Sequence, residues 1–585
     1  MLKLLVLIIS ICNILTSALQ VDVRREYDKQ WYEHATFYQV YPRSFKDTNG
    51  DGVGDLPGIT SKLEYLRNLG INAIWLSPCF QSPMVDNGYD VSDFRAIHDE
   101  FGTMADYEEM ISVANDLGIK IMLDFVPNHS SDKHEWFERS VRREEPYTDF
   151  YVWHDGRQDA QGERIPPNNW ISVFDGPAWT WNEERGQYYL HQFYPQQPDL
   201  NYRNPRVLEE MKNVLIFWLE RGAAGFRLDA INHMFENPSL EDEPVSGWGD
   251  PGTYPYLDHI HTKDLLETYS VVEEFRRVVD NFAQEHGTDA KILMTEAYAN
   301  ISFTMMYYES AEGVQRAHMP FNFGLINDVH WDTTVRRIKE KIDEWLDNMP
   351  PAGTSNWVAG SHDHSRVGSR LGPERVGLMN TLVLTLPGTS ITYYGEEIGM
   401  IDFRDFDFWD GRDPNRTPMQ WDDTVFAGFT NGTKTWLPVH PGYVTRNVWQ
   451  QDLGEQRTHL KHYRQLSALR KEDTFIHGDF LVKILGERVF GYIRSLPGHP
   501  TYCMVFNYHN QIEDVDLSVF AALPDTVEVV VSTLDSNYLP GNNVNIRNIS
   551  MRPYDALVLK ASGGKLLSPA ISLLLFVLSK LLIWR

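Results

Sequence analysis

The feature of the sequence that most constrains the fold is an alternation of short apolar runs with amphipathic helical stretches, beginning at Ala35. Apolar strands separated by helices indicate a parallel sheet covered on both faces. The strand-like runs begin near Ala35, Asn72, Lys120, Gly225, Lys291, Met319, Trp357 and Ile391. Strand–helix units repeated over this length predict an α/β fold, a (β/α)8 TIM barrel.

The alternation is interrupted once and then replaced. Residues 130–204, after the third strand, are rich in aromatic, Pro, Asp and Asn residues with little periodicity, which indicates an inserted subdomain B. Beyond residue 475, strand-like runs follow one another without helices, which indicates a C-terminal antiparallel β domain. We expect the barrel at 19–129 and 205–475, the insertion at 130–204 and the β domain at 476–561.

Both ends of the chain are expected to be processed. A basic start followed by an apolar run and small residues predicts a signal peptide at 1–18, cleaved near Ala18. The apolar run Leu566–Trp584 lacks the basic flank that normally follows a membrane-spanning anchor. The small residues before it fit a GPI-attachment signal at 562–585, with Ser562 as the lipid-anchor site, although the spacer is short. These features predict a protein of the secretory pathway, anchored at the extracellular face of the cell membrane.

The cysteine content and the net charge limit which bonds and partners are expected. Once Cys12 leaves with the signal peptide, Cys79 and Cys503 remain, far apart in the sequence and without metal-ligand spacing. The sequence leaves open whether these two cysteines form a disulfide or stay as free thiols. The 81 acidic residues exceed the 53 basic ones, and there is no basic aromatic stripe, which disfavours nucleic acid as a partner. Glycosylation sequons lie at Asn300, Asn415, Asn431 and Asn548. A fifth, at Asn128, is set aside because the adjacent His129 is a candidate catalytic residue.

The most reactive stretch is GFRLDAIN, from Gly225 to Asn232. Strand alternation places Arg227 and Asp229 on one face, where the guanidinium is expected to lower the pKa of the carboxyl, as a carboxylate nucleophile requires. A buried structural ion pair is the alternative. Further polar clusters close other strands: DFVPNH at 124–129, Glu296, and His362 with Asp363. Active sites of such barrels form at these strand ends, and paired carboxylates suit glycoside cleavage.

In order and spacing, these clusters resemble the signature regions of glycoside hydrolase family 13, the α-amylase family. QPDLN at 197–201 and GRDPNRTPMQW at 411–421 resemble motifs of its α-glucosidases, and the chain is most similar to secreted, GPI-anchored insect maltases of the mosquito type. The resemblance implies that Asp229 is the nucleophile, Glu296 the general acid/base and Asp363 the carboxylate that steadies the distorted sugar. It also implies that His129, Arg227 and His362 bind the glucose hydroxyls. Ser361 departs from the family's usual Asn, and we expect activity to survive this change.

The resemblance implies a closed, exo-acting pocket as well. Asp86, paired with Arg412, would close the pocket around the non-reducing end, and Tyr89 would stack on the sugar; by itself, NGYD would pass for an ordinary turn. In the α-glucosidases that this chain resembles, the residue after the nucleophile correlates with linkage preference. Val at this position accompanies cleavage of α-1,6 links, and Ala or Thr accompanies cleavage of α-1,4 links. Ala230 therefore predicts α-1,4 preference, unless it merely packs against a neighbouring strand.

The stretch DTNGDGVGD carries oxygen ligands at alternate positions, as in the first part of an EF-hand loop. We expect one structural Ca²⁺ here and no organic cofactor; the alternative is a solvated acidic turn. The expected ligands are Asp47, Asn49, Asp51, the Val53 carbonyl and Asp55.

The sequence thus predicts a retaining exo-α-glucosidase (a maltase) that releases glucose from maltose, sucrose and short α-1,4-linked oligosaccharides. The alternatives are a non-catalytic relative, like the heavy chains of amino-acid transporters, or a transglucosylating relative such as an isomerase. Some mosquito maltases that resemble this chain also serve as docking sites for bacterial toxins, and the resemblance raises the same role here.

Overall fold

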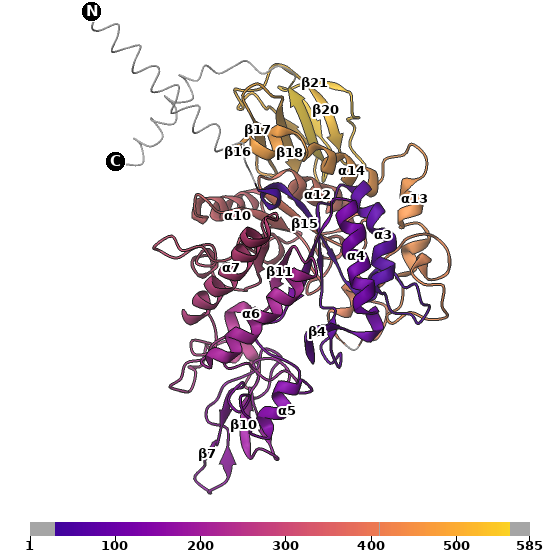
Figure 1. The fold of residues 1–585 in the computed structure, drawn as a ribbon. Coiled ribbons are helices and arrows are strands. Elements are labelled where there is room, and N and C mark those ends of the chain that lie inside the picture. The colour runs from indigo at the N-terminus through magenta and orange to yellow at the C-terminus, as the bar shows by residue number, and fades with distance from the viewer. Residues whose placement is uncertain (1–29, 409, 562–585) are drawn as a thin grey trace, which may run out of the picture.

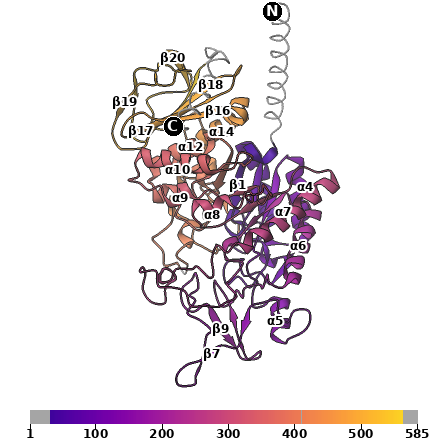
Figure 2. The same ribbon diagram turned by 90° about the vertical axis from the view of Figure 1, so that its left-hand side faces the viewer.

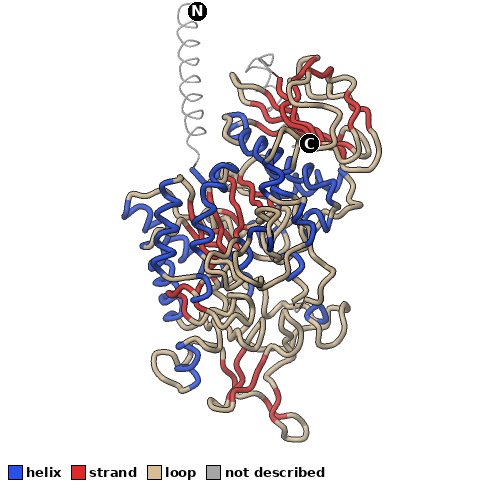
Figure 3. Tube along the Cα trace, turned by 90° about the vertical axis from the view of Figure 1, so that its right-hand side faces the viewer, coloured by secondary structure: helices blue, strands red, loops and turns tan. Residues whose placement is uncertain are grey.

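The protein is built around eight parallel strands, as the computed structural model shows for residues 30–408 and 410–561. The strand order is β13-β12-β11-β5-β2-β1-β15-β14, and the helices cover its outer face (Figures 1 and 3). The strands are β1 Thr36–Val40, β2 Ala73–Leu76, β5 Lys120–Phe125, β11 Gly225–Leu228, β12 Ile292–Thr295, β13 Met319–Pro320, β14 Asn356–Val358 and β15 Thr389–Tyr393. The predicted TIM barrel with a C-terminal β domain is confirmed.

The seam between the first and last strands of this order is joined by a side chain. Asn356 of β14 is fully buried, and its Nδ2 donates to the Pro320 carbonyl of β13 at 2.6 Å. Its Oδ1 accepts the Asn322 N–H at 3.0 Å. The amide therefore satisfies one backbone group of the short strand β13 and one of Asn322 just after it, and buried backbone groups need such partners.

The helices pack their apolar faces on the strands. They are α3 Leu56–Leu69, α4 Met104–Asp116, α6 Pro205–Glu220, α7 Glu267–His286, α10 Val335–Asn348, α12 Val376–Thr385 and α14 His459–Leu469. Asp55 begins α3 by accepting the Gly58 N–H, and Gly70 ends it at a φ of 92°. Every residue of α12 is buried, because this helix lies between the barrel and the C-terminal sheet (Figure 2).

Residues 130–204 lie at the end of the molecule opposite the C-terminal sheet (Figures 1 and 2). They hold α5 Glu135–Val141 and an antiparallel sheet of β6 Trp153–His154, β10 Gln187–Leu190 and β9 Trp179–Asn182. Trp170, Trp179 and Tyr188 belong to a small core of their own. The segment begins directly after the third barrel strand, so it stands over the ends of the barrel strands, where side chains can reach the mouth.

The C-terminal sheet has the order β16-β17-β18-β23-β20-β21. Its strands are β16 Asp479–Ile484, β17 Val489–Ser495, β18 Thr501–Asn507, β20 Thr526–Ser532, β21 Asn543–Asn545 and β23 Ala556–Ala561. The sequence patterns missed β16, whose residues are mostly half-buried and lack a continuous apolar run. Arg375, after the barrel strand β14, donates to the Tyr508 carbonyl and so ties the sheet to the barrel.

The two cysteines lie in the described part of the chain, and its two ends lie outside it. Cys79 and Cys503 are both buried and free, so they do not form a disulfide. The predicted signal peptide and the Ser562 anchor site lie outside the described residues. Within residues 30–408 and 410–561, no helix combines the length and apolar character needed to cross a membrane.

Candidate active site

A cavity of about 300 Å³ opens at the carboxyl ends of the barrel strands. Eight of the nine predicted catalytic and substrate-binding residues line it: Asp86, Tyr89, His129, Asp229, Glu296, His362, Asp363 and Arg412. The ninth, Arg227, lies beneath its floor and is 2% exposed. The sequence missed other lining residues, including Phe174 and Phe193, because residues 130–204 lack a periodic pattern that would place them.

Arg227 joins the carboxylates of the floor. Its Nη1 donates to Asp124 at 2.9 Å and also contacts Asp229, while its Nη2 lies 3.6 Å from Glu296. The β5–β11 register sets Arg227 directly opposite Asp124. The sequence placed Asp124 in a polar cluster but gave it no role, since register between strands is not visible in a single chain.

Burial dominates the charge balance of the two central carboxyls. It raises the pKa of Asp229, and the Arg227 guanidinium, which lowers it, does not fully offset the effect. The predicted effect of Arg227 on the pKa of Asp229 is therefore present, but burial outweighs it. Burial likewise raises the pKa of Glu296, although the Arg227 guanidinium lowers it. Because neighbouring carboxyls cannot all ionise, the cluster retains a proton. The direct Arg227 contact favours the ionised form at Asp229.

The backbone after Asp229 positions Glu296. Ala230 adopts a left-handed conformation, with φ 46° and ψ 32°, at the end of β11. This bend aims the Ala230 N–H at Glu296 Oε2, which accepts it at 2.8 Å. Ala230 is 6% exposed and lines the cavity, so the alternative that it only packs against a barrel strand does not hold.

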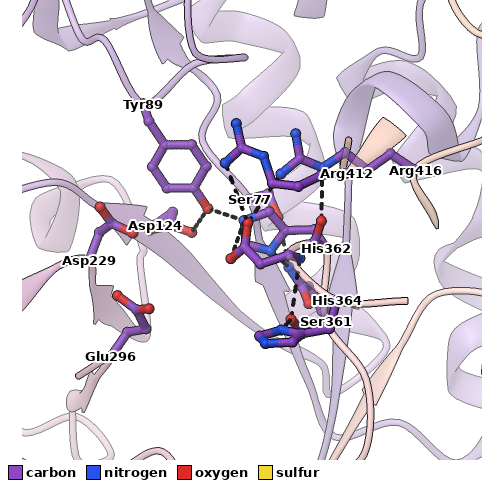
Figure 4. Close-up of polar contacts among 12 residues, drawn as sticks. Ser77, Tyr89, Asp124, Asp229, Glu296, Ser361, His362, His364, Arg412 and Arg416 are labelled. Carbon is purple, nitrogen blue, oxygen red and sulfur yellow. Dashed lines mark hydrogen bonds and ion pairs between the residues drawn. The ribbon is translucent and has the colours of Figure 1, made fainter. Parts of the chain in front are cut away.

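A chain of hydrogen bonds holds Tyr89 and His362 against the floor (Figure 4). Gln39 Nε2 lies 2.8 Å from His362 Nδ1, and His362 Nε2 lies 2.7 Å from the Tyr89 hydroxyl, which donates to Asp124 at 3.2 Å. With the Gln39 amide as donor, His362 carries its hydrogen on Nε2. Burial lowers the pKa of His362 well below its ordinary value, so the ring is neutral.

Asp363 is held between two arginines of the GRDPNRTPMQW motif. Arg416 donates to Asp363 at 3.1 Å and to the His362 carbonyl at 2.8 Å, and Arg412 Nη1 lies 3.6 Å from Asp363. Burial opposes ionisation, but the guanidiniums of Arg416 and Arg412 hold the pKa of Asp363 below its ordinary range. Asp363 is therefore a carboxylate at neutral pH. The sequence missed Arg416, which shares its motif with Arg412.

One side of the cavity is closed by a pair predicted from the sequence. Arg412 Nη2 donates to Asp86 at 2.9 Å, and Gln197 of QPDLN donates to the other Asp86 oxygen at 3.1 Å. Asp410 accepts from the same guanidinium and fixes its orientation. The ion pair thus joins the loop after β2 to the loop after β15 across the mouth.

Hydrogen bonds hold His129 and Ser361 in place at the mouth of the cavity. His129 lies 3.1 Å from the Tyr89 carbonyl through Nε2, and burial lowers its pKa to about 3. It pairs by backbone with Asp199 of QPDLN, which ties the insertion to the barrel. The Ser361 hydroxyl accepts the Asp363 N–H at 3.3 Å and lies 3.2 Å from His364 Nδ1. A serine therefore still supports the loop that carries Asp363.

The predicted glycosylation sites differ in exposure. Asn300, Asn431 and Asn548 are exposed. Asn415 is 3% exposed, and the Tyr393 hydroxyl donates to its carbonyl at 3.3 Å. The prediction of a glycan on Asn415 is wrong, because a bulky sugar must project from the surface.

The predicted Ca²⁺ loop consists of tight turns closed by its own oxygens. Asp47 accepts the N–H groups of Gly50 and Gly52 at 2.7 and 2.8 Å, and Asp51 accepts that of Val53 at 2.7 Å. Asp55 accepts from Thr48 and caps α3. In the described part of the chain, no three His, Cys, Asp or Glu side chains gather as a metal site. Ca²⁺ would therefore depend on the Asn49 and Val53 oxygens as well; an all-oxygen set suits this ion.

Comparison with known proteins agrees with this geometry. Residues 39–479 match the model of the α-amylase catalytic domain. The chain is 52% identical to an α-glucosidase of Culex pipiens, over 97% of each chain, and 47% identical to maltase 1 of Drosophila virilis, over 91% of this chain and 87% of that one. A solved α-glucosyl transfer enzyme is similar with a TM-score of 0.78 and 33% identity, covering 92% of this chain and 100% of that one.

Proposed function

This chain belongs to the α-amylase family, and we propose that it is a retaining exo-α-glucosidase that frees glucose from the non-reducing ends of maltose, sucrose and short α-1,4-linked oligosaccharides. The observation that carries the proposal is the contact of one buried guanidinium, Arg227, with both Asp229 and Glu296 beneath a closed pocket. A pair of carboxyls, one ionised and one protonated, is what glycoside cleavage requires.

Each carboxyl has a distinct part in the reaction. The Asp229 carboxylate attacks the anomeric carbon as Glu296 gives its proton to the leaving oxygen, so the glycosidic bond breaks and a glycosyl ester forms. Glu296, now ionised, takes a proton from water, and the resulting hydroxyl displaces Asp229. Asp363, held ionised by Arg416 and Arg412, favours the positive charge that develops on the sugar ring.

Exo-action follows from the closed side of the pocket. The Asp86–Arg412 ion pair leaves room for one terminal sugar, and a chain continuing past that end would collide with it. The neutral His129 and His362 and the Tyr89 ring complete the walls around that sugar. Attack within a long polymer is therefore disfavoured.

Stereochemistry tests the mechanism. NMR of the first product should show α-glucose; β-glucose as first product, or an Asp229–Glu296 separation of roughly 6.5 to 9.5 Å in place of about 5 to 5.5 Å, would refute retention. Asp229→Asn should abolish turnover and keep the melting temperature, since an amide of similar shape cannot form the ester.

Transfer of glucose to a sugar is the second candidate. The same covalent intermediate serves both reactions, and the similar solved structure is of an α-glucosyl transfer enzyme. Product analysis on sucrose and maltose separates the two: free glucose indicates hydrolysis, and new oligosaccharides or sucrose isomers indicate transfer. The presence of Asp229, Glu296 and Asp363 disfavours a non-catalytic relative.

We also propose one structural Ca²⁺ held by Asp47, Asn49, Asp51, Asp55 and the Val53 carbonyl, and a glycoprotein anchored outside the cell through a lipid on Ser562. Support for the metal is the oxygen-rich loop, and support for the anchor is the sequence of the C-terminus. Release from membranes by a phosphatidylinositol-specific phospholipase tests the anchor. Docking of a bacterial toxin stays a prediction from the resemblance.

A further inference from the structure

A second cavity, of about 480 Å³, lies beside the active site, on the side of the helices that follow β12 and β13. Its lining includes Tyr298, Asn300, Phe323 and Lys341. Tyr298 lines both cavities, so its ring is a wall common to the two. The second cavity therefore begins where the active-site pocket ends.

The shared wall is aromatic and accessible. Tyr298 stacks on Phe323 with ring centroids 4.6 Å apart and planes inclined by 11°, yet remains 37% exposed. Across the cavity, Lys341 pairs with Asp328 at 2.9 Å and with Glu344 at 2.7 Å. A flat aromatic face opposite charged and polar groups suits a sugar, which offers both C–H faces and hydroxyls.

The same cavity carries a candidate attachment point for a sugar. Asn300 is exposed and begins the sequon Asn300-Ile301-Ser302. Its Oδ1 accepts the Phe303 N–H at 3.1 Å and so caps the short helix α8 Ile301–Met305, which leaves Nδ2 for the glycosidic bond. Asn300 follows Glu296 by four positions in the chain, so their Cα atoms lie within about 14 Å.

We propose that a glycan on Asn300 occupies this second cavity and limits the length of oligosaccharide that the active site accepts. The inference rests on the proposed exo-α-glucosidase function. Glu296 must face the leaving-group oxygen, and Tyr298 follows it by two residues, so the second cavity adjoins the leaving-group side. The Asp86–Arg412 ion pair closes the end of the pocket that takes the terminal sugar. A long substrate must therefore extend past Tyr298, where the glycan competes with it for space.

Removal of the sequon without touching Asn300 tests the proposal. Ser302 is exposed, so Ser302→Ala should leave the fold and the α8 cap in place. In protein from a glycosylating host, the kcat/KM ratio of maltopentaose to maltose should rise by about threefold or more in Ser302→Ala. Ser550→Ala, which removes the Asn548 sequon in the C-terminal domain, is the matched control and should leave the ratio unchanged.

A second measurement does not depend on activity. Hydrogen exchange of α9 Gly324–Asn327, whose end residues Gly324 and Asn327 border the cavity, should be slower with the glycan present than in Ser302→Ala. An unchanged substrate ratio together with unchanged exchange overturns the proposal, as does mass spectrometry that finds Asn300 unmodified. Failure to cleave maltose in every variant, with exchange still slowed by the glycan, instead refutes the proposed function and retains the glycan in the cavity.

Discussion

Replacement of Ala230 by valine tests how one residue sets linkage preference. Ala230 follows Asp229, lines the pocket and is 6% exposed, so two added methyl groups must enter the space where the second sugar lies. Differences of one or two methyl groups in a pocket change discrimination by about 1–3 kcal/mol. We expect unmodified protein to prefer maltose over isomaltose. The kcat/KM ratio should move toward isomaltose by about tenfold in Ala230→Val.

The same change carries a separate cost in stability. Ala230 is left-handed, with a φ of 46°, a conformation that costs an L-residue about 1–2 kcal/mol and is worse for a β-branched side chain. A lower melting temperature should therefore accompany Ala230→Val. Its N–H still donates to Glu296, so the position of the acid, and hydrolysis itself, should persist.

Ala230→Thr separates the two effects. Threonine has nearly the shape of valine and the same backbone strain, but in the resembling α-glucosidases it accompanies α-1,4 preference. Its melting temperature should fall as that of Ala230→Val does, while its maltose preference should be kept. Equal efficiency of the unmodified protein on both sugars would refute the role of Ala230, and an equal ratio shift in both variants would attribute it to strain.

Three further results are expected. Arg412→Ala should reduce kcat/KM on maltose by about a hundredfold, because Asp86 loses its partner and the closed end opens; unchanged kinetics would remove this pair from substrate binding. Glu396 lies in the turn Glu396–Ile398 after β15, and burial raises its pKa to about 8. The folded state therefore holds a proton that the unfolded state releases, and stability should fall as pH rises from about 4.5 toward 8, by up to about 1.4 kcal/mol per pH unit. Melting curves of Glu396→Gln should show a shallower fall, and an identical slope would contradict the assignment. Chelation should lower the melting temperature more than the rate at low temperature, and an unchanged melting temperature would exclude Ca²⁺ from the 47–55 loop.

The fold could be predicted because most of its strands and helices follow from patterns of neighbouring residues in the sequence. Each barrel strand is a short apolar run, and β11 reads as one even though it carries Arg227. Strand β16 could not be found, because its residues are only partly buried and its stability comes from pairing with β17. The seam at Asn356 was equally invisible, since an amide that joins β14 to β13 looks like any other polar residue in sequence.

The sequence by itself determined which groups carry the chemistry: Asp229, Glu296 and Asp363 follow strand-like runs, and such positions converge on one barrel mouth. Only the tertiary structure decided their charges. Asp124, paired across the β5–β11 register, shares Arg227 with two other carboxyls, and burial then raises the pKa of Asp229 where the neighbouring arginine alone would lower it. The tertiary structure also buried Asn415, a predicted glycan site, and placed Asn300 in the lining of the cavity that shares Tyr298 with the active site. The exposure of a side chain and the register between strands depend on residues distant in the chain, and a short motif holds no information about those residues.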